Sequence, residues 1–194
     1  MKVLTHYFRP FSAPLRNLAA LPVAEQRTTL AWLAAHEPLP DRLIHSEYLG
    51  KRAEVERWMY QAFAEAGGEP ERTHPHYFVL GTFSLWESDG SCSVSVPLAA
   101  VPARSLSFTL TDSFFNYFAT NLRGHPIPPR AYHRRIYVAA ELEEALSAHD
   151  LPTDAWQTDP ERRFEPYVEA QAWSDRGLEQ LLMPPPEADR PGPD

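Results

Sequence analysis

The chain has 194 residues, 43% of them hydrophobic and 23% charged, which fits one globular domain and excludes a chain that is disordered throughout. At this length a folded protein needs no disulfide or structural metal to be stable. The formal net charge of −8 disfavours a surface that binds nucleic-acid phosphates.

The first part of the chain predicts a strand followed by a helix. Residues 2–8 are rich in β-branched and aromatic side chains and stop before Pro10, as a short strand would. Residues 23–36 follow Pro22, which suits the first turn of a helix, and Pro38 prevents the helix from continuing. We expect this helix to be amphipathic.

The strongest helical pattern covers residues 48–66. Apolar side chains recur there at helical spacing and are expected in the core: Val55, Trp58, Met59, Ala62, Phe63 and Ala66. Charged side chains are expected on the other side of the helix: Lys51, Arg52, Glu54, Glu56 and Arg57. Gly67 and Gly68 follow, and glycine readily adopts the left-handed conformation that closes helices.

The middle of the chain changes to the two-residue period of strands. Residues 77–86, 93–101 and 105–111 are rich in aromatic, β-branched and hydroxyl side chains, which predicts a group of antiparallel strands. Residues 112–119 fit either an extension of the third strand or a helix.

The last third returns to short alternating elements. We expect strands at residues 136–139 and 167–173, and helical turns at residues 141–149 and 176–183. Helices are therefore expected towards both ends of the chain, with the strands between them. Because strands and helices do not alternate strictly, an α+β fold is favoured.

These elements predict a single α+β domain over residues 1–183. Its sheet should be mostly antiparallel, or mixed, and packed by the two helices of the amino-terminal half. Residues 184–194 are proline-rich and polar, so they cannot bury enough surface to offset chain entropy and are expected to form a disordered tail.

Cysteine content and hydropathy indicate the cellular compartment of the protein. Cys92 is the single cysteine and cannot form a disulfide within the chain, and residues 1–10 lack the apolar run of a signal peptide. No stretch approaches the ~20 consecutive apolar residues that cross a bilayer. We expect a cytoplasmic protein without membrane or nucleic-acid partners, for which a small-molecule ligand and the oligomeric state stay open.

Several signatures of enzymes are missing from the sequence. It contains no GxGxxG, GxxxxGK[ST], HExxH, CxxC or GxSxG motif. Their absence disfavours four classes of protein: Rossmann dinucleotide-binding proteins, P-loop nucleotide hydrolases, zincin proteases and hydrolases with a GxSxG nucleophile turn.

The first group of residues that could carry chemistry is a pair of histidines. If the segment is extended, His74 and His76 point to the same side, where two imidazoles can share a metal. A third ligand would have to come from His6, His125, His133 or an acid elsewhere. A metal-dependent hydrolase is one hypothesis, and a loop with hydrogen-bonded imidazoles is the other.

The second group lies on the strand predicted at residues 167–173. Tyr167, Glu169, Gln171 and Trp173 share one face there, which either meets solvent or lines a pocket. A carboxylate flanked by aromatic side chains in a cleft would have a raised pKa, useful for an acid or a base.

A third group is a row of hydroxyls at alternating positions, Ser105, Ser107, Thr109 and Thr111. On one strand face they either bind a polar ligand or reflect the preference of hydroxyl residues for exposed strands. The row alone does not choose between these two interpretations.

Three short segments together resemble ADP-ribosyltransferases. They are Thr-His-Tyr at residues 5–7, Ser-Phe-Thr at residues 107–109 and Glu-Ala-Gln at residues 169–171. The resemblance covers about fifteen residues. It departs from members whose essential glutamate is second in an acid-x-glutamate pair, because Gln171 holds that position here.

This resemblance implies NAD as the cofactor and a role for each residue. His6 would bond the ribose, Tyr77 would stack on nicotinamide, and Ser107 or Thr109 would support the site. Glu169 would orient the nucleophile or the ribose as nicotinamide leaves. A protein that only binds a partner, without catalysis, stays an alternative, as does the metal-dependent hydrolase.

Overall fold

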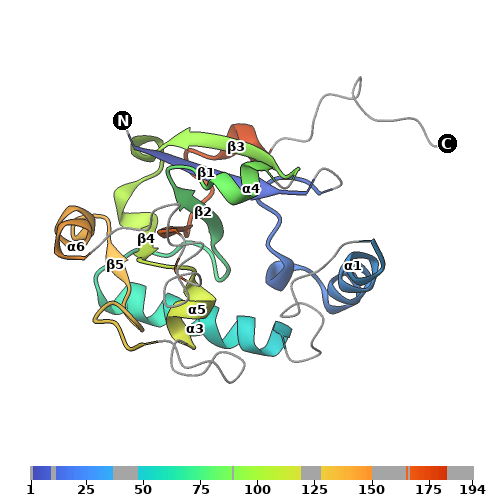
Figure 1. Ribbon diagram of the computed structural model, residues 1–194, viewed down its shortest axis with the longest axis horizontal. Coiled ribbons are helices and arrows are strands. Elements are labelled where there is room, and N and C mark those ends of the chain that lie inside the picture. Colours follow the sequence, from blue (N-terminus) through green and yellow to red (C-terminus); the bar gives the residue numbers. More distant parts are fainter. Residues whose placement is uncertain are drawn as a thin grey trace.

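Figure 1 shows the computed structural model, whose described residues are 2–9, 12–36, 48–88, 90–118, 128–149, 165 and 167–182. The strands are β1 (Val3–Phe8), β2 (His76–Leu80), β3 (Cys92–Pro97), β4 (Leu106–Thr109), β5 (Tyr137–Val138) and β6 (Glu169–Ala172). They form a six-stranded sheet in the order β3-β1-β2-β6-β4-β5. Every pairing between these strands is antiparallel, which confirms the predicted α+β class.

The helices lie between the strands and after the last strand. They are α1 (Val23–His36), α3 (Tyr48–Glu65), α4 (Ser84–Ser88), α5 (Ser113–Tyr117), α6 (Leu142–Ala148) and α7 (Glu179–Leu182), with the short 3-10 turn η1 (Leu18–Ala20). The two helices predicted in the amino-terminal half are therefore present. Gly67, with a φ of 87°, follows α3 as expected.

Two middle segments differ from their predictions for local reasons. The strand predicted at residues 77–86 ends at Leu80 and gives way to α4, because Gly81 has a φ of 88° and turns the chain. The ambiguous segment after β4 becomes α5. Asp112 caps this helix, since its Oδ1 accepts hydrogen bonds from the backbone N–H groups of Phe114 at 2.9 Å and Phe115 at 3.3 Å.

The strand register assigns each side chain to one face of the sheet. Thr5 pairs with Val79 and Val79 pairs with Glu169, so these three share one face, which we call the polar face. His6 and Phe78 are their immediate neighbours in sequence and lie on the opposite face, which we call the apolar face.

The apolar face carries the main hydrophobic core. Side chains from β1, β2, β4 and β6 pack there with residues of α6 and of the segment before α7: Leu4, Phe78, Phe108, Ala170, Ala172, Leu142, Ala145 and Leu178. The polar face is covered by α3 and α5, which lie together on one side of the sheet in Figure 1. Phe63 of α3 stacks on Trp173, just after β6, with ring centroids 5.9 Å apart.

Two predictions concern the ends of the chain and membranes. Within the described residues no helix is long and apolar enough to cross a membrane. The proline-rich segment predicted at residues 184–194 lies outside the described residues. The tail therefore stays a prediction.

Candidate functional site

A cavity of about 210 Å³ opens over the polar face, between the sheet, α3, α5 and η1. Two carboxylates, Asp112 and Glu169, and two guanidinium groups, Arg16 and Arg52, belong to its lining. Its aromatic lining residues are Tyr48, Tyr77, Trp86, Phe114 and Tyr167. Ionisable groups of both signs therefore meet aromatic side chains in a small, partly open volume.

Glu169 is the most perturbed acid of this cavity. It projects from β6 onto the polar face and is only 5% exposed. Its pKa rises from the ordinary 4.5 to about 7, because burial disfavours the ionised form and the neighbouring Asp112 carboxylate adds like charge. Arg52 and hydrogen bonds from Ser113 and Gln171 act in the opposite direction. Near neutral pH the carboxyl group can therefore both accept and release a proton.

A chain of hydrogen bonds along the polar face leads to Glu169. The indole Nε1 of Trp173 donates to Ser107 Oγ at 2.9 Å, and Ser107 donates to Gln171 Oε1 at 2.7 Å. The amide Nε2 of Gln171 donates to Thr109 Oγ1 at 3.1 Å and to Glu169 Oε1 at 3.0 Å. Since Gln171 accepts at one end and donates at the other, its amide has one orientation, and that orientation supports the ionised carboxylate.

Asp112 is held on two sides. While its Oδ1 caps α5, its Oδ2 accepts a hydrogen bond from the Tyr167 hydroxyl at 2.8 Å. The cap fixes this carboxylate near Glu169, and the like charge contributes to the raised pKa of Glu169.

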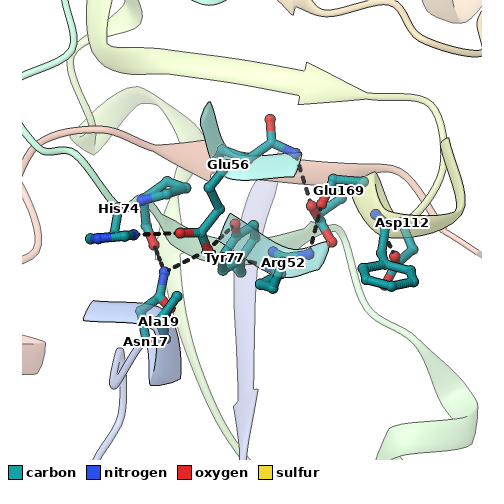
Figure 2. A network of polar contacts seen from close by, with 12 residues as sticks. Asn17, Ala19, Arg52, Glu56, His74, Tyr77, Asp112 and Glu169 are labelled. Atoms are coloured by element: carbon teal, nitrogen blue, oxygen red, sulfur yellow. Dashed lines mark hydrogen bonds and ion pairs between the residues drawn. The ribbon is translucent and has the colours of Figure 1, made fainter. Parts of the chain in front are cut away.

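A second buried acid, Glu56 of α3, organises the opposite wall. It is 1% exposed, and its Oε1 accepts from Tyr77 Oη at 2.7 Å, Asn17 Nδ2 at 3.1 Å and Arg52 Nε at 3.3 Å. Its Oε2 lies 2.5 Å from His74 Nδ1. Figure 2 shows these side chains converging on the carboxylate. Three of these four partners, Asn17, Arg52 and Tyr77, line the cavity. Glu56 does not line the cavity itself, but its hydrogen bonds hold these three side chains in place.

Arg52 links the two acidic centres. Besides its bond to Glu56, its Nη1 donates to Ser113 Oγ at 3.2 Å, and its guanidinium lies over the Tyr77 ring, 4.1 Å from the centroid. Ser113 in turn bonds Glu169. Burial raises the pKa of Tyr77 well above its ordinary value, so its hydroxyl stays protonated and donates to Glu56.

Of the site residues that the sequence predicts, the structure brings four together. Glu169 and Tyr77 line the cavity, whereas Ser107 and Thr109 are fully buried below it and hold Gln171. The row of hydroxyls is thus buried and hydrogen-bonded, and it does not meet solvent.

His6 does not line this cavity. It lies on the apolar face, its Nε2 accepts a hydrogen bond from the Leu15 N–H at 2.9 Å, and its Nδ1 lies 2.7 Å from the Tyr77 carbonyl oxygen. Since a carbonyl only accepts, Nδ1 carries the proton. Burial lowers the pKa of His6, in keeping with this neutral form. His6 therefore joins backbone segments and does not meet Glu169.

The histidine pair bonds two different acids. His74 bonds Glu56, whereas His76 bonds the Leu15 carbonyl and Asp175 Oδ1, the latter at 2.8 Å. Among the described residues no cluster of three His, Cys, Asp or Glu side chains could hold a metal. The metal hypothesis finds no third ligand in that part of the chain.

Arg52 and Glu56 are residues for which the sequence interpretation was wrong. We expected them on the charged side of their helix, but both are buried against the sheet. Their spacing carried the signal, because positions 52 and 56 are in phase with Val55, Met59 and Phe63 on a helix. The capping position of Asp112, two residues before Phe114, was likewise present in the sequence.

Comparison with known proteins gives no relative for this chain. No protein-family model, no curated protein and no solved structure matches it. Functional conclusions therefore depend on the geometry of the cavity.

Proposed function

We propose that the protein is an enzyme that cleaves the bond between nicotinamide and ribose in NAD and transfers the ADP-ribosyl group. One observation carries this proposal: Glu169, with a pKa of about 7, faces an aromatic-walled cavity that also holds Tyr77. The resemblance to ADP-ribosyltransferases supports the choice of NAD among cationic ligands through the two segments that hold or line the cavity, residues 107–109 and 169–171.

The lining of the cavity suits a positively charged ring. The nicotinamide ring of NAD carries a positive charge, and the faces of tyrosine and tryptophan attract cations. Tyr48 and Trp86 supply such faces, whereas one face of the Tyr77 ring already lies under the Arg52 guanidinium. Asp112 and Glu169 add carboxylates. The same groups favour the cation-like ribose that forms as nicotinamide leaves.

In the proposed reaction the bond from ribose C1′ to nicotinamide nitrogen breaks, and its electron pair stays on the now neutral nicotinamide. A hydroxyl of water or of an acceptor forms the new bond at C1′. Ionised Glu169 accepts the proton of that hydroxyl, as a general base with a pKa near the working pH does. Gln171 and Ser113 keep the carboxylate oriented during this step.

The roles of the other predicted residues follow their places in the structure. Tyr77, held by Glu56, is a wall for the nicotinamide ring. Ser107 and Thr109 act through Gln171 as positioning residues. We assign His6 no role in the chemistry, because its two ring nitrogens are engaged by backbone groups.

NAD binding and nicotinamide release test the proposal. Saturating NAD should raise thermal stability, by about 2.7 kcal/mol at 100 times the dissociation constant. Nicotinamide should appear with wild-type protein and not with Glu169→Gln, whereas Glu144→Gln, which removes an exposed charge on α6, should behave as wild type. No thermal shift at millimolar NAD, or equal release by Glu169→Gln, would reject the proposal.

A further inference from the structure

A larger groove adjoins the Glu169 cavity. It has a volume of about 740 Å³ and lies between the end of β1, the segment that follows it, and α1. Arg16 and Leu18 line both spaces, so the two are neighbours with Arg16 at the junction. In Figure 1, α1 stands apart from α3 and α6, beside the segment that leads away from β1.

The sizes of the two spaces suit a ligand that extends across both. Pockets for small molecules usually measure ~300–1,000 Å³. The Glu169 cavity, at about 210 Å³, is below that range, whereas the groove, at about 740 Å³, is within it. The cavity therefore suits only the reacting part of a ligand, and the groove has room for the rest.

The lining of the groove suits an aromatic base joined to an anion. Tyr7, Phe8 and Trp32 contribute aromatic side chains, and Trp32 is 39% exposed at its position on α1. Arg9 and Arg16 add two guanidinium groups to a chain whose net charge is −8. Aromatic faces stack on bases, and guanidinium groups bind phosphate through paired hydrogen bonds.

Arg16 is able to exchange its present partner for a phosphate. Its Nη2 lies 3.2 Å from Glu25 Oε2, and both side chains of this pair are about half exposed. Exposed pairs of this kind contribute little to stability. Breaking this pair therefore costs little, and it releases the Arg16 guanidinium to bind a phosphate at the junction.

We infer that the groove binds a nucleoside diphosphate group, with its base beside Trp32 and its phosphates at Arg16. This inference rests on the proposed function, since it makes the groove the site of the ADP-ribose half of the substrate. It assigns recognition of the ADP-ribose half to α1. Among the side chains that the structure describes, α1 contributes none to the buried core.

Calorimetric titration with ADP-ribose and with nicotinamide tests this inference. Arg16→Gln and Trp32→Ala should each weaken ADP-ribose binding by about tenfold or more, the scale of losing a charged hydrogen bond or a stacking contact. Nicotinamide affinity should not change in Trp32→Ala, because Trp32 lines the groove and not the Glu169 cavity. Arg104→Gln is a matched control, since Arg104 is also exposed and also 3.2 Å from a glutamate, Glu69. Tyr60→Ala is the control for an exposed aromatic side chain.

The outcomes separate this inference from the proposed function. ADP-ribose binding that depends on Arg16 and Trp32, without NAD cleavage, would support the groove as the nucleotide site and reject the proposed reaction. NAD cleavage with an unchanged KM in both variants would support the reaction and overturn the inference. Absence of ADP-ribose binding at millimolar concentration, or equal binding by both variants and wild type, would also overturn it.

Discussion

Gln171 donates a hydrogen bond of 3.0 Å to Glu169, two residues before it on the same face of β6. The same amide group donates to Thr109, and its oxygen accepts from Ser107. A glutamine at this position thus connects the buried hydroxyls of β4 to the carboxyl group that faces the cavity. Glutamine suits this position because its amide supplies a donor that a carboxylate would lack.

Gln171→Leu should therefore both destabilise the protein and change Glu169. Loss of the amide leaves buried hydrogen-bonding groups without their partner, which costs about 1–3 kcal/mol of unfolding free energy. The pKa of Glu169 should rise further, since a hydrogen bond that lowers it is gone. Urea unfolding and a carboxyl NMR titration measure the two effects. Gln61→Leu, at an exposed position of α3, is the control and should change neither the stability nor the Glu169 titration. An unchanged Glu169 titration in Gln171→Leu would contradict the hydrogen bond from Gln171 to Glu169.

Glu169→Gln should alter the pH dependence of stability. The folded pKa of about 7 exceeds the ordinary 4.5, so the folded state binds the proton more tightly than the unfolded state does. The stability that Glu169 contributes is full below pH 4.5 and is lost as pH rises through 7. Relative to Glu169→Gln, the wild-type protein should lose about 3 kcal/mol at most over this interval. Parallel stability curves for the two proteins from acid to neutral pH would show that Glu169 is not buried as described.

Glu56→Ala should be among the most destabilising substitutions on α3. It leaves the buried Arg52 guanidinium without its carboxylate, at a cost of about 3–5 kcal/mol. The double substitution Arg52→Met with Glu56→Leu should cost less than Glu56→Ala alone, because the guanidinium that Glu56→Ala leaves without its carboxylate is also removed. Urea unfolding compares them, with Glu65→Ala as an exposed control. A double variant that is less stable than Glu56→Ala would show that charge burial is not the cause.

The core under α3 gives a prediction that depends on degree of burial. Phe63 is fully buried and stacks on Trp173, so Phe63→Ala should cost about 3–5 kcal/mol. Trp58 is only partly buried, against Tyr117, so Trp58→Ala should cost less. Denaturant unfolding measures the free energy of unfolding of both variants. A larger loss for Trp58→Ala than for Phe63→Ala would contradict the greater burial of Phe63.

Elements with a strong local pattern could be predicted from the sequence. The helix α1 and the start of α3 have the expected bounds, because proline and an apolar repeat mark them locally. The strand before Gly81 was predicted too long, since one positive φ at a glycine was enough to end it and permit α4. The alternating polar face of β6 was also visible, and with it Glu169.

What the sequence could not provide is the relation between distant strands. Whether His6 and Glu169 share a face depends on which residues of β1, β2 and β6 pair, and a shift of one residue reverses the answer. In the observed register Thr5, not His6, is on the same face as Glu169. The helical spacing of Arg52 and Glu56 places them in phase with the core, but their contacts with Tyr77 depend on how α3 lies against the sheet.

The pH profile of nicotinamide release from NAD tests the central claim most directly. If Glu169 is the general base, the rate should rise with pH to a plateau, with an apparent pKa of about 7, and Glu169→Gln should abolish the rise together with most of the rate. A wild-type protein that releases no nicotinamide at any pH, or a variant that keeps the rate and its pH dependence, would contradict the account.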